Sequence, residues 1–128
     1  MAIVGSGTDM VDVMRIRRLL ANGPVGERLK RRVFTPDERA YCDSRGGKAA
    51  LSYAARFAAK EAVKKALGTR FGFAWPDIEV VRTSKGKPRI VLHGRTKAKA
   101  ERLGAGDIHL SITHVDHIAV AHAVIERH

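Results

Sequence analysis

The stretch that decides the fold reads Ala55-Arg56-Phe57-Ala58-Ala59-Lys60-Glu61-Ala62-Val63-Lys64-Lys65-Ala66-Leu67-Gly68. Alanine and leucine are strong helix formers, and glycine is common just past a helix C-terminus, so we expect a long helix from about Lys48 to Leu67. At roughly 100° per residue, Glu61 and Lys65 lie about 40° apart on one side of this helix. Three more cations continue that side: Arg56, Lys60 and Lys64. Small apolar residues line the opposite side: Ala55, Ala59, Ala62, Val63 and Ala66.

The charged side of this helix allows two interpretations. One carboxylate among several cations on a rigid helix could hold a metal ion beside a polyphosphate. The alternative is a solvated helix face, on which a Glu61–Lys65 pair contributes about 0.3–0.5 kcal/mol. Phe57 falls in the middle of the charged side, and an exposed aromatic ring there favours a partner surface or a pocket wall. The stretch by itself leaves the metal site and the solvated face open.

The segments on either side of the helix predict further helices and antiparallel strands. Asp12 is a suitable N-cap for a helix, and Thr35-Pro36-Asp37-Glu38 has the pattern of a capping box. Alternating apolar residues and turn signals predict strands over 2–4, 78–82, 88–93, 109–114 and 118–125. Further helices are expected over 13–20, from Thr35 to about Ser44, and over 95–103, with a partly helical basic segment at 25–34. This mixture predicts an α+β fold, and the length of 128 residues predicts a single domain over residues 1–128.

The charge of the chain is strongly positive. It has 24 Lys and Arg residues against 13 Asp and Glu residues, a formal net charge of +11, and the stretch 15–32 carries more than half of it. A local excess of this size indicates an anionic partner. Nucleic acid is one candidate, but the stretch has no aromatic residues for base stacking, no zinc-finger spacing and no RNP-like motif. An acidic protein or a phosphorylated small molecule explains the charge equally well.

Membrane insertion and secretion are not indicated. No apolar run approaches the roughly 18 residues that a membrane span needs. Asp9 and Asp12 stand where a signal peptide would have its apolar region. Cys42 is the single cysteine, which excludes an internal disulfide and favours a reducing cytoplasm.

Three polar clusters are unspecific alone but informative together. They are Asp9 after the first strand, Glu61 with Lys65, and the run 111–114; taken singly, Asp9 could cap a turn and His114 could end a strand. In this order they resemble the holo-acyl-carrier-protein synthases, the small phosphopantetheinyl transferases of fatty-acid synthesis. The resemblance is carried by Gly5-Ser6-Gly7-Thr8-Asp9-Met10-Val11 with Arg15-Ile16, by the stretch 56–68, by Lys85-Gly86-Lys87-Pro88 and by Ser111-Ile112-Thr113-His114. It covers essentially the whole chain and departs at Ser6, where an apolar residue is more usual.

The resemblance implies an antiparallel sheet packed against the central helix, and transfer of 4′-phosphopantetheine from coenzyme A to a serine of an acyl carrier protein. It implies a catalytic set of Asp9, Glu61 and Lys65, with Mg²⁺ held by Asp9 and Glu61. It further implies contacts to coenzyme A from Arg56, Lys60, Lys65, Lys87, Thr113 and His114. A hard metal ion agrees with the absence of a Cys or His cluster at ligand spacing. The general base stays open between Lys65, a metal-bound water and a carboxylate.

The resemblance also gives the basic stretch an acidic protein partner. We expect four arginines to steer and dock the carrier protein: Arg15, Arg18, Arg28 and Arg31. For the last three, an unspecific solvated basic face is an equal alternative. Related proteins are homotrimers with active sites between subunits, so the same assembly is expected here. Two rival functions remain: a basic nucleic-acid-binding module in which Asp9 and Glu61 are structural, and a transferase that modifies a carrier domain of a megasynthase.

Overall fold

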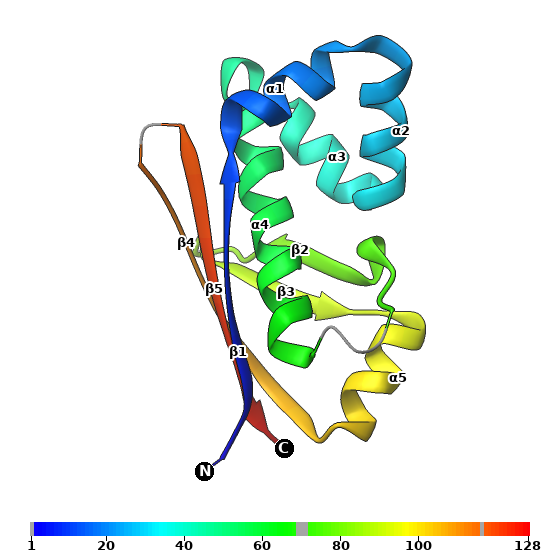
Figure 1. The fold of residues 1–128 in the computed structure, drawn as a ribbon, viewed down its shortest axis with the longest axis vertical. Coiled ribbons are helices and arrows are strands. Elements are labelled where there is room, and N and C mark those ends of the chain that lie inside the picture. The colour runs from blue at the N-terminus through cyan, green and yellow to red at the C-terminus, as the bar shows by residue number, and fades with distance from the viewer. Residues whose placement is uncertain (1, 69–71, 116) are drawn as a thin grey trace.

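The computed structural model describes residues 2–68, 72–115 and 117–128, and it has an α+β fold, as predicted (Figure 1). The α-helices of the described part are α1 (Val13–Ala21), α2 (Gly23–Val33), α3 (Pro36–Asp43), α4 (Ala49–Leu67) and α5 (Gly94–Arg102). Two short 3₁₀ turns are η1 (Gly46–Lys48) and η2 (Trp75–Asp77). The strands are β1 (Ile3–Asp12), β2 (Ile78–Arg82), β3 (Pro88–Leu92), β4 (Ala105–Val115) and β5 (Ile118–Arg127).

The strands form two antiparallel sheets around the central helix. The larger sheet has the order β1-β5-β4, and β2 pairs with β3 as the predicted hairpin. Helix α4 packs against one face of the larger sheet, as Figure 1 shows. The sheet presents small side chains to the helix there, and Ala119, Ala121 and Ala123 of β5 are fully buried. The expected sheet packed against a long central helix is therefore confirmed.

The first strand is longer than the three residues predicted. It continues through the glycine-containing segment to Asp12, because its backbone pairs with β5 from Ile3↔Glu126 to Asp12↔Ile118. A Cβ added at Gly5 would lie 2.1 Å from the Ala66 carbonyl oxygen, and one added at Gly7 would lie 2.2 Å from that of Ala62. The glycines are therefore a requirement of close strand–helix packing and not the sign of a loop.

The predicted helix ends are present. The Asp12 carboxylate accepts a hydrogen bond from the Met14 amide at 2.9 Å, which caps α1. Thr35 and Glu38 form the capping box of α3, through the Glu38 N–H to Thr35 Oγ1 and the Thr35 N–H to Glu38 Oε1. Helix α4 ends at Gly68, whose φ of +100° is a backbone conformation that favours glycine.

The distribution of charge around α4 differs from the prediction. Arg56 and Lys60 were expected on an exposed charged side, but their exposed fractions are 7% and 0%. Phe57 was expected to be exposed, yet it is half-buried and stacks on Trp75 with 5.1 Å between ring centres. The reason is that α3 and β2 cover this helix on the side opposite the sheet, so it is packed from two directions. Among the described helices, none is long and apolar enough to cross a membrane.

Candidate active site

Strand β1 brings Asp9 to the edge of α4. Alternate residues of a strand point to the same face, so Gly5, Gly7 and Asp9 all face the helix. The two glycines hold the strand against the helix backbone, and Asp9 follows two residues later, where its side chain is only 17% exposed. The close approach of strand and helix therefore places this carboxylate beside the helix and not in open solvent.

Lys65 meets Asp9 across this contact. Its Nζ lies 3.0 Å from Asp9 Oδ1 and also donates to the Thr8 carbonyl oxygen at 2.9 Å. Side chains on a helix lean toward its N-terminus, which carries Lys65 back toward the level of Asp9. The structure thus brings together two of the three residues that the sequence resemblance names as catalytic, and their catalytic role stays a prediction.

Glu61 lies one helical turn before Lys65 and is half-buried. Within the described residues, its carboxylate takes part in no hydrogen bond or ion pair, and Lys65 turns to Asp9 instead. The surface Glu61–Lys65 pair considered above is thus absent. Glu61 and Asp9 are both linked to Lys65, one by a single helical turn and the other by an ion pair, and carboxylate oxygens are donors that suit a hard cation.

A second group of predicted residues converges on a pocket of about 280 Å³ between α3, α4, β2 and β4. Arg56, Thr113 and His114 all line it, although they come from segments more than fifty positions apart. The pocket also holds Tyr41, Arg45 and Arg82, which sequence reasoning missed. We call it the arginine pocket.

Three guanidinium groups of the arginine pocket surround one aromatic ring. Their carbon atoms lie 4.3 Å (Arg56), 5.2 Å (Arg82) and 5.6 Å (Arg45) from the centre of the Tyr41 ring, and Arg82 also donates a hydrogen bond to the Tyr41 hydroxyl. Within the described part, Arg56 Nε is the one buried side-chain polar atom without a hydrogen-bond partner. A buried donor left unpaired among like charges indicates a place that an anion would fill.

Lys87 lies beside the arginine pocket and does not line it. Its neighbours Gly86 and Pro88 contribute to the pocket wall, whereas Lys87 lines an adjoining hollow of about 470 Å³ together with Lys85 and Ser111. Lys87 is exposed on this hairpin. Lys87 therefore stays a predicted contact.

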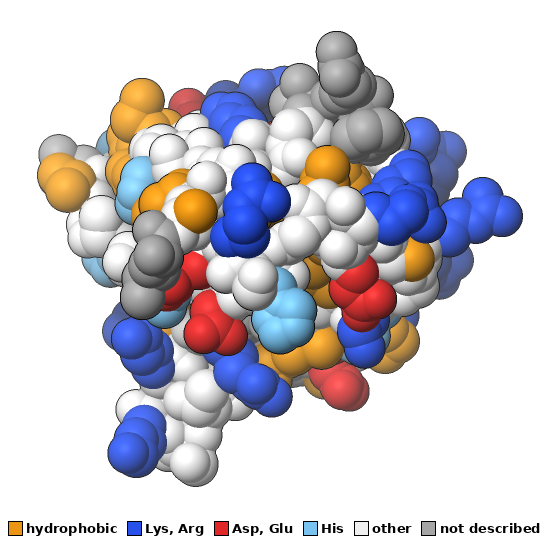
Figure 2. Space-filling view, turned by 90° about the horizontal axis from the view of Figure 1, so that it is seen from below, with side chains coloured by type: hydrophobic (Ala, Val, Ile, Leu, Met, Phe, Trp, Pro, Cys, Tyr) orange, Lys and Arg blue, Asp and Glu red, His pale blue; other side chains and the backbone are white. Residues whose placement is uncertain are grey.

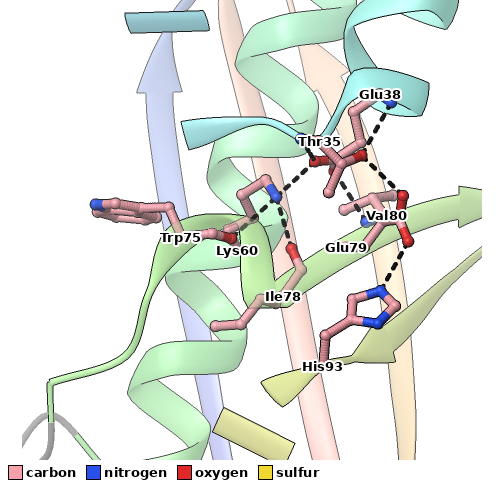
Figure 3. A network of polar contacts seen from close by, with 8 residues as sticks. All are labelled: Thr35, Glu38, Lys60, Trp75, Ile78, Glu79, Val80 and His93. Atoms are coloured by element: carbon pink, nitrogen blue, oxygen red, sulfur yellow. Dashed lines mark hydrogen bonds and ion pairs between the residues drawn. The ribbon is translucent and has the colours of Figure 1, made fainter. Parts of the chain in front are cut away.

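The predicted contact between Lys60 and coenzyme A requires a correction. Its side chain is fully buried, and Nζ donates to Glu38 Oε1 at 2.7 Å and to the carbonyl oxygens of Ile78 at 2.6 Å and Trp75 at 3.2 Å (Figure 3). Burial lowers the pKa of the Lys60 ammonium, and the adjacent Glu38 opposes this shift. All three N–H donors have partners inside the protein, so Lys60 has no free donor for coenzyme A and is withdrawn as a contact.

The network around Lys60 continues to the surface. Thr35 Oγ1 donates to Glu79 Oε2 at 2.7 Å, and His93 Nε2 lies 2.9 Å from Glu79 Oε1 (Figure 3). Burial alone would raise the pKa of Glu79, but the hydrogen bonds from His93 and Thr35 lower it overall. Trp75 makes a packing contact with Phe57, whereas His93 makes its hydrogen bond to Glu79 at the surface.

The four predicted docking arginines are all exposed. Arg15 and Arg18 lie on α1, and Arg28 and Arg31 lie on α2, which packs against α1. Neither helix places them in the arginine pocket or beside Asp9. We call the exposed side of these two packed helices, with its four arginines, the α1–α2 basic surface.

A further group of potential metal ligands lies at the other end of the larger sheet. Single ligand atoms of Asp107, His109 and Glu126 lie within 4.8 Å of one another. Figure 2 views the end of the molecule where both termini lie, and acidic and histidine side chains occur there among Lys and Arg side chains. Glu126 pairs with Ile3 and Ala121 pairs with Asp9, so this group is several residues along the sheet from Asp9.

Comparison with known proteins assigns the family. Residues 5–120 match the model of the 4′-phosphopantetheinyl transferase superfamily. The chain belongs to this superfamily. It is 50% identical to a holo-[acyl-carrier-protein] synthase of Anaeromyxobacter sp. (strain K), with 97% of this chain and 96% of the relative covered. A relative of the same name from Geobacter sulfurreducens is 46% identical, with 98% of both chains covered.

Solved structures of this superfamily have the same fold. The holo-[acyl-carrier-protein] synthase of Neisseria meningitidis superposes with a TM-score of 0.87 at 31% identity, covering 98% of this chain and 99% of that one. The enzyme of Bacillus anthracis, solved in complex with CoA (3′,5′-ADP), gives a TM-score of 0.80 at 33% identity and full coverage of both chains. The resemblance noted in the sequence is confirmed, and the protein is a phosphopantetheinyl transferase of the holo-[acyl-carrier-protein] synthase type.

Proposed function

We propose that this phosphopantetheinyl transferase moves 4′-phosphopantetheine from coenzyme A to a serine hydroxyl of an apo acyl carrier protein of fatty-acid synthesis, with the help of Mg²⁺. The observation that carries the coenzyme A assignment is the arginine pocket, where Arg56 Nε is buried without a partner beside His114. Solved relatives from Bacillus anthracis and Helicobacter pylori contain CoA, which supports the same donor here.

In the proposed reaction, the serine oxygen forms a bond to the β-phosphorus of the coenzyme A diphosphate. The bond from that phosphorus to the bridging oxygen breaks, and 3′,5′-ADP leaves with the electron pair. The serine proton passes to a base that is still to be identified. Because little covalent work falls to the protein, positioning and charge neutralisation account for most of the rate.

The described residues divide this work between two places. Arg56, Thr113 and His114, with Arg45 and Arg82, would bind the phosphate-rich end of coenzyme A in the arginine pocket. Guanidinium groups suit this task because they offer several donors in a fixed plane to phosphate oxygens. Lys87 would add a contact from the neighbouring hairpin.

The reacting diphosphate would lie near Asp9, Glu61 and Lys65. Lys65 Nζ donates to two protein oxygens and has a third N–H left, so it can donate to a diphosphate oxygen and offset charge on the leaving group. Asp9 and Glu61 would hold Mg²⁺, which suits two carboxylates and supplies charge neutralisation at the diphosphate. The fit rests on the unpaired half-buried carboxylate of Glu61 and on the all-oxygen donor set.

The carrier protein would dock on the α1–α2 basic surface. Acyl carrier proteins are small and acidic, and exposed arginines raise the rate at which such a partner arrives. Arg15 is the strongest candidate, because it lies in the N-terminal motif that carries the family resemblance.

We also propose a homotrimer with active sites between subunits. Helix α4 covers one face of the larger sheet, and in the described part of the chain no helix covers the other (Figure 1). That open face carries Met10, Val115 and Ile118, whose exposed fractions are 70%, 66% and 38%. Apolar side chains gathered on an uncovered sheet face favour an association surface. Sedimentation equilibrium should give three times the 14.0 kDa of the chain, and a monomer would refute the assembly.

The decisive test is intact mass spectrometry of an apo acyl carrier protein incubated with the enzyme, coenzyme A and Mg²⁺, with an EDTA control. A gain of one phosphopantetheine unit that EDTA abolishes is the expected result. No gain with free carriers, but a gain on an excised megasynthase carrier domain, would move the target to such domains. No gain on either would refute the proposed reaction.

A further inference from the structure

The buried Glu38–Lys60 pair connects three of the elements that build the arginine pocket, namely α3, α4 and β2. Each of α3, α4 and β2 contributes both to the pair's hydrogen-bond network and to the pocket lining. The matched residues are Glu38 and Tyr41 in α3, Lys60 and Arg56 in α4, and Val80 and Arg82 in β2. In each helix the two residues are one turn apart, and in the strand they are two positions apart. Each pocket residue therefore lies on the same side of its element as the network residue.

The pair itself is closed to ligands. The Lys60 ammonium uses all its donors internally, at distances of 2.6–3.2 Å. Both Glu38 carboxylate oxygens are also used: Oε1 accepts from the Thr35 amide and Oε2 accepts from the Val80 amide, each at 2.9 Å (Figure 3). Neither side chain has an exposed fraction above 2%. Any influence on the reaction must therefore pass through other residues.

Stability alone is a poor reason to keep such a pair. The cost of removing two charges from water often equals or exceeds their attraction, so well-packed apolar residues at buried ion pairs are frequently as stable. The pair instead fixes orientation. Its hydrogen bonds hold α3, α4 and β2 relative to one another at defined atoms.

The hydrogen bonds of Glu38 and Lys60, which we call the frame, support the arginine pocket. Three guanidinium groups converge on the Tyr41 ring, and their mutual repulsion opposes the arrangement until an anion arrives. Arg56 Nε is in addition buried without a partner. Cationic groups that the surrounding structure already holds together bind an anion without a further cost of ordering.

We propose that Glu38 and Lys60 are positioning residues that hold the arginine pocket ready for the phosphate groups of coenzyme A. The inference rests on the proposed function for the identity of the ligand. The sequence resemblance predicted that Lys60 contacts coenzyme A directly. We infer instead that Lys60 affects the affinity for coenzyme A through Arg56, Tyr41 and Arg82.

The first test is Lys60→Met, measured by isothermal titration with coenzyme A and by steady-state kinetics at a temperature where the variant is folded. We expect the Kd and the KM for coenzyme A to rise at least tenfold. The KM for the carrier protein should change less than twofold, because the α1–α2 basic surface lies outside the frame. A lower melting temperature with both KM values unchanged would show a purely structural role and overturn the proposal.

Lys64→Met is the matched control. Lys64 lies on the same helix, is half-buried and carries the same charge, but its Nζ lies 3.8 Å from the centre of the Trp75 ring and, in the described part of the chain, takes no part in the hydrogen bonds of Glu38 and Lys60. Its loss should change the coenzyme A affinity less than twofold. An equal loss in both variants would mean that the removed charge alone matters, which would contradict positioning.

A double-mutant cycle tests whether the pair acts as a unit. The double variant Glu38→Gln/Lys60→Met should bind coenzyme A no more weakly than Lys60→Met, because the frame is already lost in the single variant. Additive losses would refute the coupling. If Lys60→Met does not fold, Glu38→Gln alone, which keeps the side-chain shape, should still raise the Kd for coenzyme A by at least threefold, and an unchanged Kd would overturn the proposal.

Hydrogen exchange separates this inference from the proposed function. The Val80 amide donates to Glu38, so without any ligand it should exchange at least tenfold faster in Lys60→Met than in Lys64→Met. Equal exchange overturns the positioning role. If wild-type protein fails to bind coenzyme A, the proposed function fails, and the exchange result still decides whether the frame exists.

Discussion

Replacing Arg56 by methionine should separate binding from stability. Arg56 is 7% exposed, and its buried Nε has no partner among the described residues, which costs the unliganded protein about 1–3 kcal/mol. Stacking of the guanidinium on Tyr41, with Cζ 4.3 Å from the ring centre, stabilises the protein by about 0.5–2 kcal/mol. These contributions nearly cancel, and methionine fills much of the same volume. We therefore expect the free energy of unfolding of the unliganded Arg56→Met variant to stay within about 1 kcal/mol of wild type.

Coenzyme A binding should respond very differently. A hydrogen bond between a guanidinium and a phosphate contributes about 1.5–3 kcal/mol, so its loss should weaken binding by about 10- to 150-fold. Isothermal titration gives the Kd, and urea denaturation gives the stability of the same sample. Arg56→Lys is the control. It keeps the positive charge but lacks the planar guanidinium, so its Kd for coenzyme A should lie between those of the wild type and of Arg56→Met. An unchanged Kd together with a stability loss above about 2 kcal/mol would refute the assignment, because Arg56 would then be a packing residue.

Four further predictions test the rest of the site. Glu61→Gln should remove Mg²⁺-dependent turnover in the mass-spectrometric assay with an unchanged circular dichroism spectrum, and full activity would exclude Glu61 as a metal ligand. Arg15→Glu should raise the KM for the carrier protein more than the KM for coenzyme A; equal rises would remove it from the docking surface. Gly7→Ala should destabilise the fold by about 1–3 kcal/mol in urea, because its Cβ would lie 2.2 Å from the Ala62 carbonyl oxygen, and a neutral result would contradict the close packing of β1 on α4. Burial raises the pKa of the Cys42 thiol to about 11, so above pH 9 the unfolded chain loses this proton while the folded one keeps it. Stability should therefore fall from pH 9 to 11 with a slope that is smaller in Cys42→Ala, and identical slopes would show that this thiol does not contribute.

The sequence predicted local structure best where short-range chemistry decides it. The Asp12 cap, the capping box of Thr35 and Glu38, and the hairpin between β2 and β3 depend on neighbouring residues, and all are present. The length of β1 could not be predicted in this way. Its glycines suggest a loop until the opposing helix is known to approach within contact distance of their backbone.

For the site, the sequence by itself determined which residue types are available and the order in which they occur. That order was enough for the resemblance and for the superfamily, whereas the contact between Asp9 and Lys65 comes from the tertiary structure. The tertiary structure alone decided which cations face a ligand. Helical periodicity places Arg56 and Lys60 on one side of α4, but it cannot show that α3 and β2 cover this side and close Lys60 from solvent. It equally cannot show that Arg45 and Arg82 join Arg56 around Tyr41, because burial and convergence arise from contacts between segments far apart in the chain.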